Sequence, residues 1–188
     1  QTGYTSGVSY QENIVLKEEF ERRAMEDGKS YFGVSLDISS AYPSVHTQIL
    51  HSRLAKDGVT GDLLLYSRGI YTGTVAAMKT DGLKTTVVRE EKGSRQGHVM
   101  AGLHFKVYFM ELLEMVDGSK LGIKVDDGGV CSILCCADDT WGHSDEINRL
   151  QLIITLCERY SFLYRMSYGK GKTNVVFNSS EELTKLLT

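Results

Sequence analysis

The sequence is poor in proline, in tryptophan and in long apolar stretches. Its 188 residues include one proline and one tryptophan against 19 glycines, so turns between regular elements depend mainly on glycine. No apolar run reaches the roughly 20 residues of a membrane-spanning helix, and the first residues lack the pattern of a signal peptide. We therefore expect no membrane partner.

Cysteine is also scarce, and none of the four cysteines forms a zinc-type Cys-x-x-Cys pair. Three of them, Cys131, Cys135 and Cys136, share one short apolar segment, and the fourth is Cys157. We expect buried free thiols in a reducing, intracellular compartment.

A basic excess is missing as well. The formal net charge is -3 and the isoelectric point is about 6.0, which disfavours a stand-alone nucleic-acid binder but allows an acidic catalytic lobe. The length permits one substantial core or two small lobes. Because the chain opens on Gln1 rather than methionine, we expect a piece of a longer protein.

Hydrophobic periodicity predicts alternating helices and strands along the whole chain. Helices are expected over residues 12–26, 45–56, 62–71, 100–116, 145–160 (N-capped by Ser144) and 181–187. Strands are expected over residues 31–37, 75–79 and 83–89 (a hairpin around Asp81-Gly82), 121–125 and 130–136 (a second hairpin), 140–142 and 174–177. This order predicts an α+β fold, in which an antiparallel sheet carries helices on one face.

Two adjacent carboxylates, Asp138 and Asp139, follow an apolar strand, and Asp37 ends another apolar strand 101 positions earlier. Acids grouped in this way repel each other unless a cation offsets their charge. Two Mg²⁺ ions about 3.5–4 Å apart, held by strand-end carboxylates, would activate an attacking oxygen and stabilise a leaving one. Asp37 and Asp138 would bridge the ions. The ordinary alternatives are a solvated Asp-Asp turn and a helix-capping Asp37.

Five segments resemble motifs of the reverse transcriptase family, and they occur in that family's order. They are Gln1–Ser9, Asp37–Val45, Lys92–Gly97, Cys136–Thr140 and Ser167–Asn174. The first and last are most similar to the non-LTR (LINE-type) branch of retrotransposon enzymes, with group II intron relatives as the alternative subfamily.

The resemblance implies a polymerase palm with part of the fingers and without the thumb. Residues 1–29 would be partial fingers, 30–45 the palm with the first catalytic motif, 46–98 the fingers–palm connection, and 99–188 the remaining palm. Without the thumb and upstream fingers, the fragment alone would bind template and primer weakly, since phosphate contacts supply most of that affinity.

The resemblance also implies a catalytic centre. Asp37, Asp138 and Asp139, with the backbone of Ile38, would hold two Mg²⁺ ions, or Mn²⁺ in their place, around the primer 3′-hydroxyl and the triphosphate. Lys172 would donate a proton to pyrophosphate or stand beside it as a cation.

Substrate contacts are implied at two further segments. Backbone N–H groups of Ile38, Ser39, Ser40 and Ala41 would bind phosphate, and Tyr42 would exclude a 2′-hydroxyl. Gln96, with Arg95 beside it, would contact the incoming nucleotide, and Gly97 would let the template approach. Each residue has an ordinary alternative: a core aromatic at Tyr42, a solvated loop at 95–96, and a basic turn at Lys172. Trp141 is expected to pack on the hairpin rather than stack on a base.

The function implied is an RNA-directed DNA polymerase core of a retrotransposon-like element, acting on an RNA template, a DNA primer and deoxynucleoside triphosphates. The rest of a polyprotein would accompany it, and it would act in the nucleus if the element is eukaryotic.

Several substitutions depart from the family pattern. Cys136 stands where an aromatic usually precedes Ala-Asp-Asp, Pro43 stands where a second aspartate is frequent, and His98–Ala101 replaces the usual residues after Arg-Gln-Gly. Thr5 and Val8 occupy frequent arginine positions. They motivate an alternative, a decayed or domesticated palm that binds or scaffolds. A third alternative is another palm-type enzyme, an RNA-templated RNA polymerase or a nucleotide cyclase.

Overall fold

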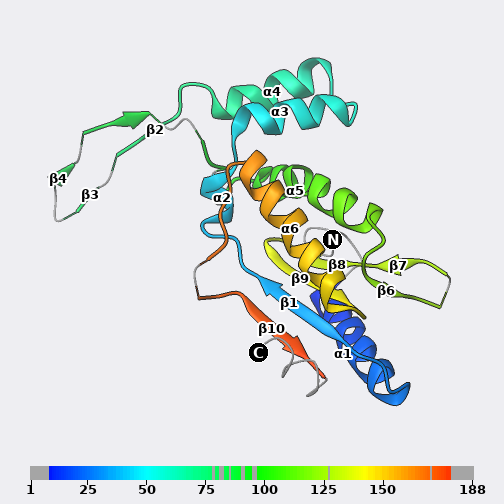
Figure 1. Ribbon diagram of the computed structural model, residues 1–188. Coiled ribbons are helices and arrows are strands. Elements are labelled where there is room, and N and C mark those ends of the chain that lie inside the picture. The colour runs from blue at the N-terminus through cyan, green and yellow to red at the C-terminus, as the bar shows by residue number, and fades with distance from the viewer. Residues whose placement is uncertain are drawn as a thin grey trace. The chain divides into compact units, whose positions relative to one another are not determined.

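The computed structural model describes residues 9–77, 79–80, 83–84, 86–89, 92–94, 97–126, 128–169 and 171–178. The chain divides into two compact units (Figure 1). We call Gln1–Ser39 with Phe109–Thr188 the sheet unit, and Ser40–Tyr108 the helical unit. The divisions predicted from the sequence fall at 29/30, 45/46 and 98/99, and the assignment of segments to fingers and palm stays a prediction.

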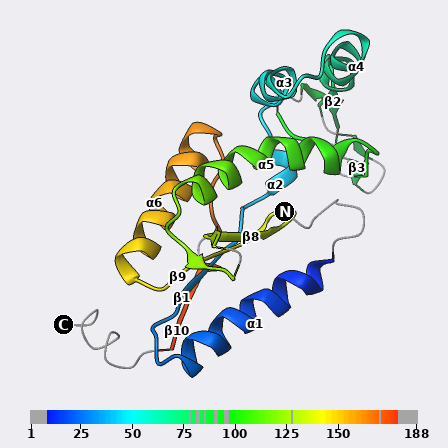
Figure 2. The ribbon, with the colours of Figure 1, turned by 90° about the vertical axis from the view of Figure 1, so that its right-hand side faces the viewer.

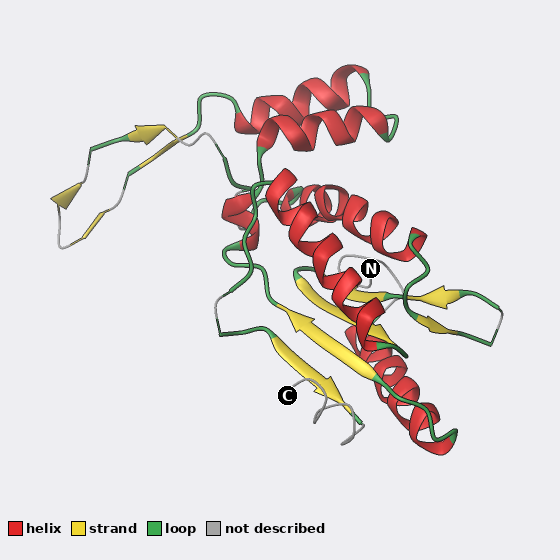
Figure 3. Ribbon diagram, in the orientation of Figure 1, coloured by secondary structure: helices red, strands yellow, loops and turns green. Residues whose placement is uncertain are grey.

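A four-stranded antiparallel sheet forms the centre of the sheet unit (Figure 3). Its strands lie in the order β10-β1-β9-β8. They are β1 (Phe32–Leu36), β8 (Ile133–Cys136), β9 (Asp139–Ser144) and β10 (Asn174–Phe177). Strands from distant parts of the sequence therefore meet, and the predicted α+β class is confirmed.

Helices lie on both faces of this sheet, whereas the sequence predicted one (Figure 2). A Cβ atom added to Gly142 would lie 3.0 Å from Ile153 of α6 (Ile147–Leu163). The next residue, His143, points to the opposite face, where its ring lies 4.9 Å from that of Phe20 in α1 (Tyr10–Glu26). Thus α6 covers one face and α1 covers the other.

The helix α5 (Ala101–Gly118) packs its C-terminal half against α6. Phe109 meets the edge of Tyr160 at a centroid distance of 5.8 Å, and Tyr160 stacks on Tyr164 at 4.2 Å. The Tyr164 hydroxyl donates a hydrogen bond to Glu111. Burial of large aromatic side chains such as Phe109 contributes roughly 1.5–3 kcal/mol each.

The helical unit contains three more helices and a β-ribbon. They are α2 (Ala41–Ser44), α3 (Thr47–Lys56), α4 (Gly61–Tyr71), β2 (Val75–Ala76), β3 (Lys79–Thr80), β4 (Leu83–Lys84) and β5 (Val88–Arg89). Strand β2 pairs with β5 and β3 with β4, which confirms the predicted hairpin. Its predicted turn at residues 81–82 lies outside the described residues, as does the predicted helix 181–187.

The predicted strand 130–136 was wrong in one respect, because it breaks at Ser132. Strand β7 (Val130–Cys131) pairs with β6 (Ile123–Lys124), whereas β8 joins the main sheet. The Ser132 hydroxyl accepts a hydrogen bond from Gly122 N–H, and its own N–H donates to Asp117. Ser132 therefore leaves both pairings, although its carbonyl still accepts a backbone hydrogen bond from His143 N–H at 3.1 Å.

The predicted N-cap at Ser144 was also wrong. Ser144 is the last residue of β9, where it pairs with Phe32, and α6 is capped by Glu146. The Ser144 hydroxyl donates a hydrogen bond to the Leu121 carbonyl and accepts one from the Glu146 N–H at 3.3 Å, one residue before the helix begins.

All four cysteines are free, as expected. Cys135 and Cys157 are buried, and Cys131 and Cys136 are half-buried. Burial raises the pKa of the Cys131 thiol to about 11 and that of Cys157 to about 12, so both are neutral thiols. No helix among the described residues is long and apolar enough to cross a membrane.

The buried ring of His143 makes stability depend on pH. Burial lowers the pKa of His143 to about 4, and the backbone of Cys131 offsets part of this shift. Neither ring nitrogen of His143 has a hydrogen-bond partner of good geometry among the described residues. Between the unfolded pKa near 6.5 and the folded value, only the unfolded chain binds this proton, so stability falls as pH drops through that window. We expect His143→Phe to remove up to about 3 kcal/mol of this dependence.

Urea unfolding of wild type and His143→Phe at pH 7 and pH 4.5 measures the effect. Wild type and variant both keep the pH dependence that comes from His104, because burial lowers the pKa of that histidine to about 4 as well. Equal pH dependence in the two proteins would contradict the prediction.

The C-terminus of α6 carries a residue suited to replacement by glycine. Arg165 has φ of 53°, and the Met166 N–H bonds back to the Ser161 carbonyl at 2.8 Å, as in a Schellman cap. We expect Arg165→Gly to stabilise the chain by about 1 kcal/mol, because the left-handed conformation costs glycine least. The matched control, Arg159→Gly in the exposed helix interior, should destabilise by about 1 kcal/mol, both measured by urea unfolding.

Candidate active site

Three carboxylates gather at one end of the sheet. Leu36 of β1 pairs with Thr140 of β9, so the next step of the antiparallel register places Asp37 opposite Asp139, on the same face. Asp138 occupies the two-residue loop that joins β8 to β9. The structure thus brings together acids that are 101 residues apart.

The loop between β8 and β9 holds Ala137 in a left-handed conformation, with φ of 55°. A positive φ at the first central residue alone is typical of II′ hairpin turns, where glycine is usual. Alanine is strained here by about 1 kcal/mol or more. The tight turn fixes the two neighbouring acids at the rim of the sheet.

The carboxylates influence each other electrostatically. Partial burial raises the pKa of Asp139, and the negative charges of Asp138 and Asp37 raise it further. Neighbouring carboxylates with like charge favour protonation of one carboxylate or the binding of a cation.

One cation is already present. The Lys172 ammonium lies 3.1 Å from Oδ2 of Asp37. That oxygen is buried and lacks a hydrogen-bond partner of good geometry among the described residues, so the contact is an ion pair. The Lys172 side chain is 67% exposed, so this pair contributes little to stability and can exchange with another cation.

A short segment, 167–172, brings Lys172 to Asp37. Ser39 N–H donates to the Ser167 carbonyl, and Gly169 N–H donates to the Asp37 carbonyl, both at 2.8 Å. A Cβ atom on Gly169 would lie 2.9 Å from Asp37 Oδ2 and 3.1 Å from Lys172 Cδ. A larger residue at position 169 would force the side chain of Asp37 or Lys172 to move, because Cβ contacts under 3.0 Å require a shift.

The same bonds orient the backbone after Asp37. Since the Asp37 carbonyl and the Ser39 N–H point to one edge, the N–H and carbonyl of Ile38 point to the other edge, where β1 pairs with β9. This direction suits the predicted role of the Ile38 backbone in metal binding. The Ser39 N–H donates to the Ser167 carbonyl, and its part in phosphate binding stays a prediction.

The acids suit a divalent cation without enclosing one. Among the described residues, no three His, Cys, Asp or Glu side chains converge closely enough to hold an ion. The buried oxygen of Asp37 is paired only with the exposed Lys172, and the charges of Asp138 and Asp37 raise the pKa of Asp139, so a further cation would be favoured here. Mg²⁺ is usually held by one or two carboxylates together with waters and substrate phosphates, so the oxygen donors fit that ion.

Six predicted substrate residues belong to the helical unit, and the structure describes four of them. Ser40 is left-handed (φ 51°), Ala41 is buried and opens α2, and Gly97 has φ of 87°. Tyr42 lies 5.1 Å from the ring of Phe105, so its alternative as a packing aromatic has support. Arg95 and Gln96 lie outside the described residues.

Within the helical unit, the second half of the motif Asp37–Val45 lies beside the first residues of the motif Lys92–Gly97. Ser94 N–H donates to the Tyr42 carbonyl, and Gly93 N–H donates to the Val45 carbonyl, both at 2.7 Å. The Ser94 hydroxyl shares a hydrogen bond with Tyr71, whose hydroxyl also bonds Nδ1 of buried His104 at 2.7 Å. Two predicted motifs are therefore neighbours.

Trp141 packs on the sheet, as expected. A Cβ atom on Gly33 would lie 2.7 Å from the indole, and the Lys17 ammonium stands 4.6 Å above the ring. The indole N–H donates to the Tyr31 hydroxyl at 3.0 Å. The indole is thus fixed between the sheet and α1.

Two features were missed from the sequence. In the sequence Gly169 stood out only as part of the segment Ser167–Asn174. Its close approach to Asp37 depends on how residues 167–172 fold back towards the sheet. The polar cluster of Ser67, Tyr71 and His104 joins residues 33 or more positions apart, and the only signal was an isolated histidine in an apolar helix.

Comparison with known proteins gives one family. The model described as reverse transcriptase (RNA-dependent DNA polymerase) matches residues 1–185. No curated protein matches the sequence.

Similar solved structures are telomerases. Apo telomerase from Candida tropicalis, truncated of its C-terminal domain, is 12% identical with a TM-score of 0.68, covering 92% of this chain and 36% of that one. Telomerases in complex with a TWJ fragment of telomeric RNA, each with a TM-score of 0.71, cover 92% of this chain. The Candida albicans chain is 12% identical and 31% covered; the Candida tropicalis chain is 10% identical and 30% covered.

At this identity the likeness shows the fold. The chain spans about a third of the length of these telomerase chains.

Replacement of Gly169 by alanine should disturb the contact between Asp37 and Lys172. The added methyl group would press on both side chains, so we expect Gly169→Ala to destabilise the chain by about 1–3 kcal/mol. Gly118→Ala is the matched control, because nothing lies within 4 Å of its added Cβ. Urea unfolding measures both.

A double-mutant cycle with Lys172→Ala isolates the contact. The losses should be less than additive, because alanine has no δ atom and so removes the clash at Lys172 Cδ. Strict additivity would show that Gly169 does not act through Lys172.

Proposed function

Because the chain belongs to the reverse transcriptase (RNA-dependent DNA polymerase) family, we propose that it is the core of an RNA-directed DNA polymerase. The observation that carries the proposal is the meeting of Asp37, Asp138 and Asp139 at one end of the sheet, with a lysine ion-paired to Asp37. The reaction is template-directed transfer of a deoxynucleotide to a primer, with release of pyrophosphate.

The acids would hold two Mg²⁺ ions, or Mn²⁺, together with the Ile38 carbonyl and the triphosphate. When bound, the ions lower the pKa of the 3′-hydroxyl and offset charge on the leaving oxygen. The residues of this chain position the ions: the II′ turn fixes Asp138 and Asp139, and the backbone bond to Gly169 fixes Asp37.

Lys172 would act at the leaving side of the reaction. Its long exposed side chain can leave Asp37 when cations bind there, and its ammonium can then move to the pyrophosphate as a cation or proton donor. Exchange of one cation for another keeps the charge of the carboxylates offset at each stage.

The helical unit would supply the nucleotide contacts. Backbone N–H groups of Ser40 and Ala41 would serve the triphosphate, and Tyr42 would exclude a 2′-hydroxyl. Arg95 and Gln96 would contact the incoming nucleotide and Gly97 the template. The hydrogen bond between Ser94 and Tyr42 supports a shared role for these segments.

RNA template and DNA primer are the proposed partners. Two similar telomerase structures contain a fragment of telomeric RNA, which supports an RNA partner. The segment resemblance supports a non-LTR retrotransposon as the origin, the remainder of a polyprotein as a companion, and action inside the cell, in the nucleus for a eukaryotic element.

The alternative is a catalytically weak palm that binds or scaffolds nucleic acid. Two observations favour it: Cys136 replaces the usual aromatic, and the three acids do not converge on one point.

Removal of two carboxylates tests the polymerase. In primer extension on an RNA template with the natural protein, we expect Asp138→Asn with Asp139→Asn to lower the rate by about 10²–10³-fold, because charge stabilisation in the transition state is lost. Asp145→Asn is the matched control, since Asp145 lies beyond β9 in an exposed ion pair with Arg149. Equal activity of the double variant and wild type would overturn the role of these acids.

Thermal melting separates the two candidate functions. A metal-binding centre predicts a rise in melting temperature at millimolar Mg²⁺ that the double variant lacks. No rise in either protein would favour the scaffold.

A further inference from the structure

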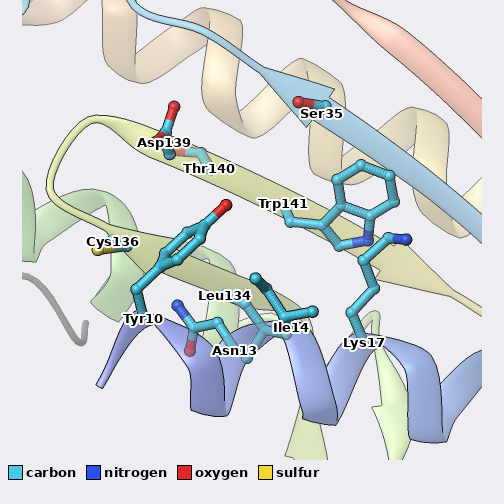
Figure 4. Close-up of a pocket in the computed structure, with 10 residues that line it drawn as sticks. All are labelled: Tyr10, Asn13, Ile14, Lys17, Ser35, Leu134, Cys136, Asp139, Thr140 and Trp141. Carbon is cyan, nitrogen blue, oxygen red and sulfur yellow. The ribbon is translucent and has the colours of Figure 1, made fainter. Parts of the chain in front are cut away.

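Two cavities lie along α1. The smaller, of 170 Å³, is lined by Tyr10, Asp139 and Trp141 (Figure 4) and belongs to the site already described. The larger, of 460 Å³, is lined by Ser30, which precedes β1, and by Asp145, which follows β9. Since the carboxylates lie at the end of β1 and the start of β9, the larger cavity is at the opposite end of the sheet. The proposed nucleotidyl transfer makes no use of it.

One wall of the larger cavity is the face of a helix. Phe20, Arg23, Ala24 and Asp27 follow one another at spacings of three, one and three positions, so they form one stripe along the C-terminal half of α1 and its cap. Phe20 is buried and Ala24 is half-buried. This wall is therefore an apolar floor with charged side chains beside it.

The facing wall is the edge of strand β6. Ile123, Lys124, Val125 and Asp126 all line the cavity, although side chains of successive strand residues point to opposite faces. Consecutive lining residues therefore mean that the strand presents its edge. Among the described residues β6 pairs only with β7, and β6 is the strand of this hairpin that lies towards α1 (Figure 1).

Lys124 supplies the backbone groups of that edge. Val125 faces β7, because its N–H donates to the Gly129 carbonyl at 3.1 Å and its carbonyl accepts from Gly128 N–H at 3.0 Å. Antiparallel partners alternate between bonded and non-bonded pairs, so Lys124 and Val130 form a non-bonded pair. The N–H and carbonyl of Lys124 thus point away from β7, where an extended chain can pair with them as a third strand.

The side chains of β6 set the pattern of such a strand. Lys124 is exposed, whereas Ile123 and Val125, on the other face, are half-buried. Residues opposite each other on neighbouring strands point to the same face. An acid opposite Lys124 would pair with its ammonium, and the residues on either side of that acid would pack against Ile123 and Val125. The groove is matched to an apolar–acidic–apolar segment.

The charges of the groove favour a polypeptide over a nucleic acid. Arg23 pairs with Asp126 and Lys29 pairs with Asp27, both at 2.6 Å and on exposed side chains. Among the described residues the lining holds three basic and three acidic side chains, whereas a nucleic-acid strand needs a basic excess. The volume lies within the range of about 300–1,000 Å³ that is typical of ligand sites.

We propose that this groove between α1 and β6 binds an extended segment of a partner protein, which adds a strand to β6 and presents an acidic residue to Lys124 between two apolar residues. Main-chain hydrogen bonds supply affinity and alternating side chains supply specificity in such strand addition. The inference goes beyond the proposed function and does not depend on it. It gives the chain a site for a protein in addition to template and primer.

Short peptides test the strand pairing. The probe is a capped, fluorescein-labelled heptapeptide, Ser-Thr-Val-Glu-Val-Thr-Ser, whose binding to the full chain is followed by fluorescence anisotropy. A methyl group on the backbone nitrogen of its glutamate should weaken binding by roughly 2- to 12-fold, because one backbone hydrogen bond is lost. Lysine in place of glutamate should weaken binding by roughly 2- to 30-fold.

Reversal of one charge tests the same pair from the protein side. Lys124→Glu should prefer the lysine peptide over the glutamate peptide, because the cross-strand pair is restored with its signs exchanged. A loss of structure would weaken both peptides without exchanging the preference. Lys120→Glu is the matched control, since Lys120 is exposed and does not line the groove, and it should keep the wild-type preference. Ala24→Phe fills the groove and should abolish binding of both peptides.

Four results would overturn the proposal: no binding of the glutamate peptide, equal binding of its N-methylated form, an unchanged preference in Lys124→Glu, or undiminished binding by Ala24→Phe. Self-association that Lys124→Glu abolishes would make a second copy of this chain the occupant, and displacement of the peptide by single-stranded DNA would make it a nucleic acid. Either result would overturn it too. Because the titrations need no metal and no turnover, peptide binding without primer extension would refute the polymerase and keep the groove, and the reverse would do the opposite.

Discussion

Repulsion among Asp37, Asp138 and Asp139 is the constraint on which the rest of the sheet unit depends. The antiparallel register between β1 and β9 places two of these carboxylates opposite each other, and a strained II′ turn adds the third. Such an arrangement lowers stability unless cations offset the charge. Lys172 supplies one such cation, and the backbone around Gly169 makes room for it.

The constraint explains why the surrounding scaffold is rigid. Helix α6 packs against Gly142 on one face and α1 packs through Phe20 against His143 on the other, so the strand that carries Asp139 is held on both sides. Charges can be kept close only where the backbone cannot relax away from them. The same double packing leaves a small cavity where the first half of α1 diverges from the hairpin.

Local signals in the sequence predicted most elements, because helix and strand periodicity are local properties. Strand β10 and the hairpin of the helical unit were predicted with their pairing direction. The errors came where side chains overrode the local pattern. Ser132 interrupts a predicted strand by bonding Gly122 and Asp117, and Ser144 stays in β9 because it pairs with Phe32.

By itself the sequence determined the family, the α+β class and the identity of the three acids, because adjacent carboxylates after an apolar strand are a local and unusual pattern. Only the tertiary structure decided that helices cover both faces, that Lys172 pairs with Asp37, and that Gly169 permits this pairing. Those facts depend on contacts between residues more than 100 positions apart, and no local pattern specifies which distant glycine will lie so close to a given carboxylate that an added Cβ would be 2.9 Å from it.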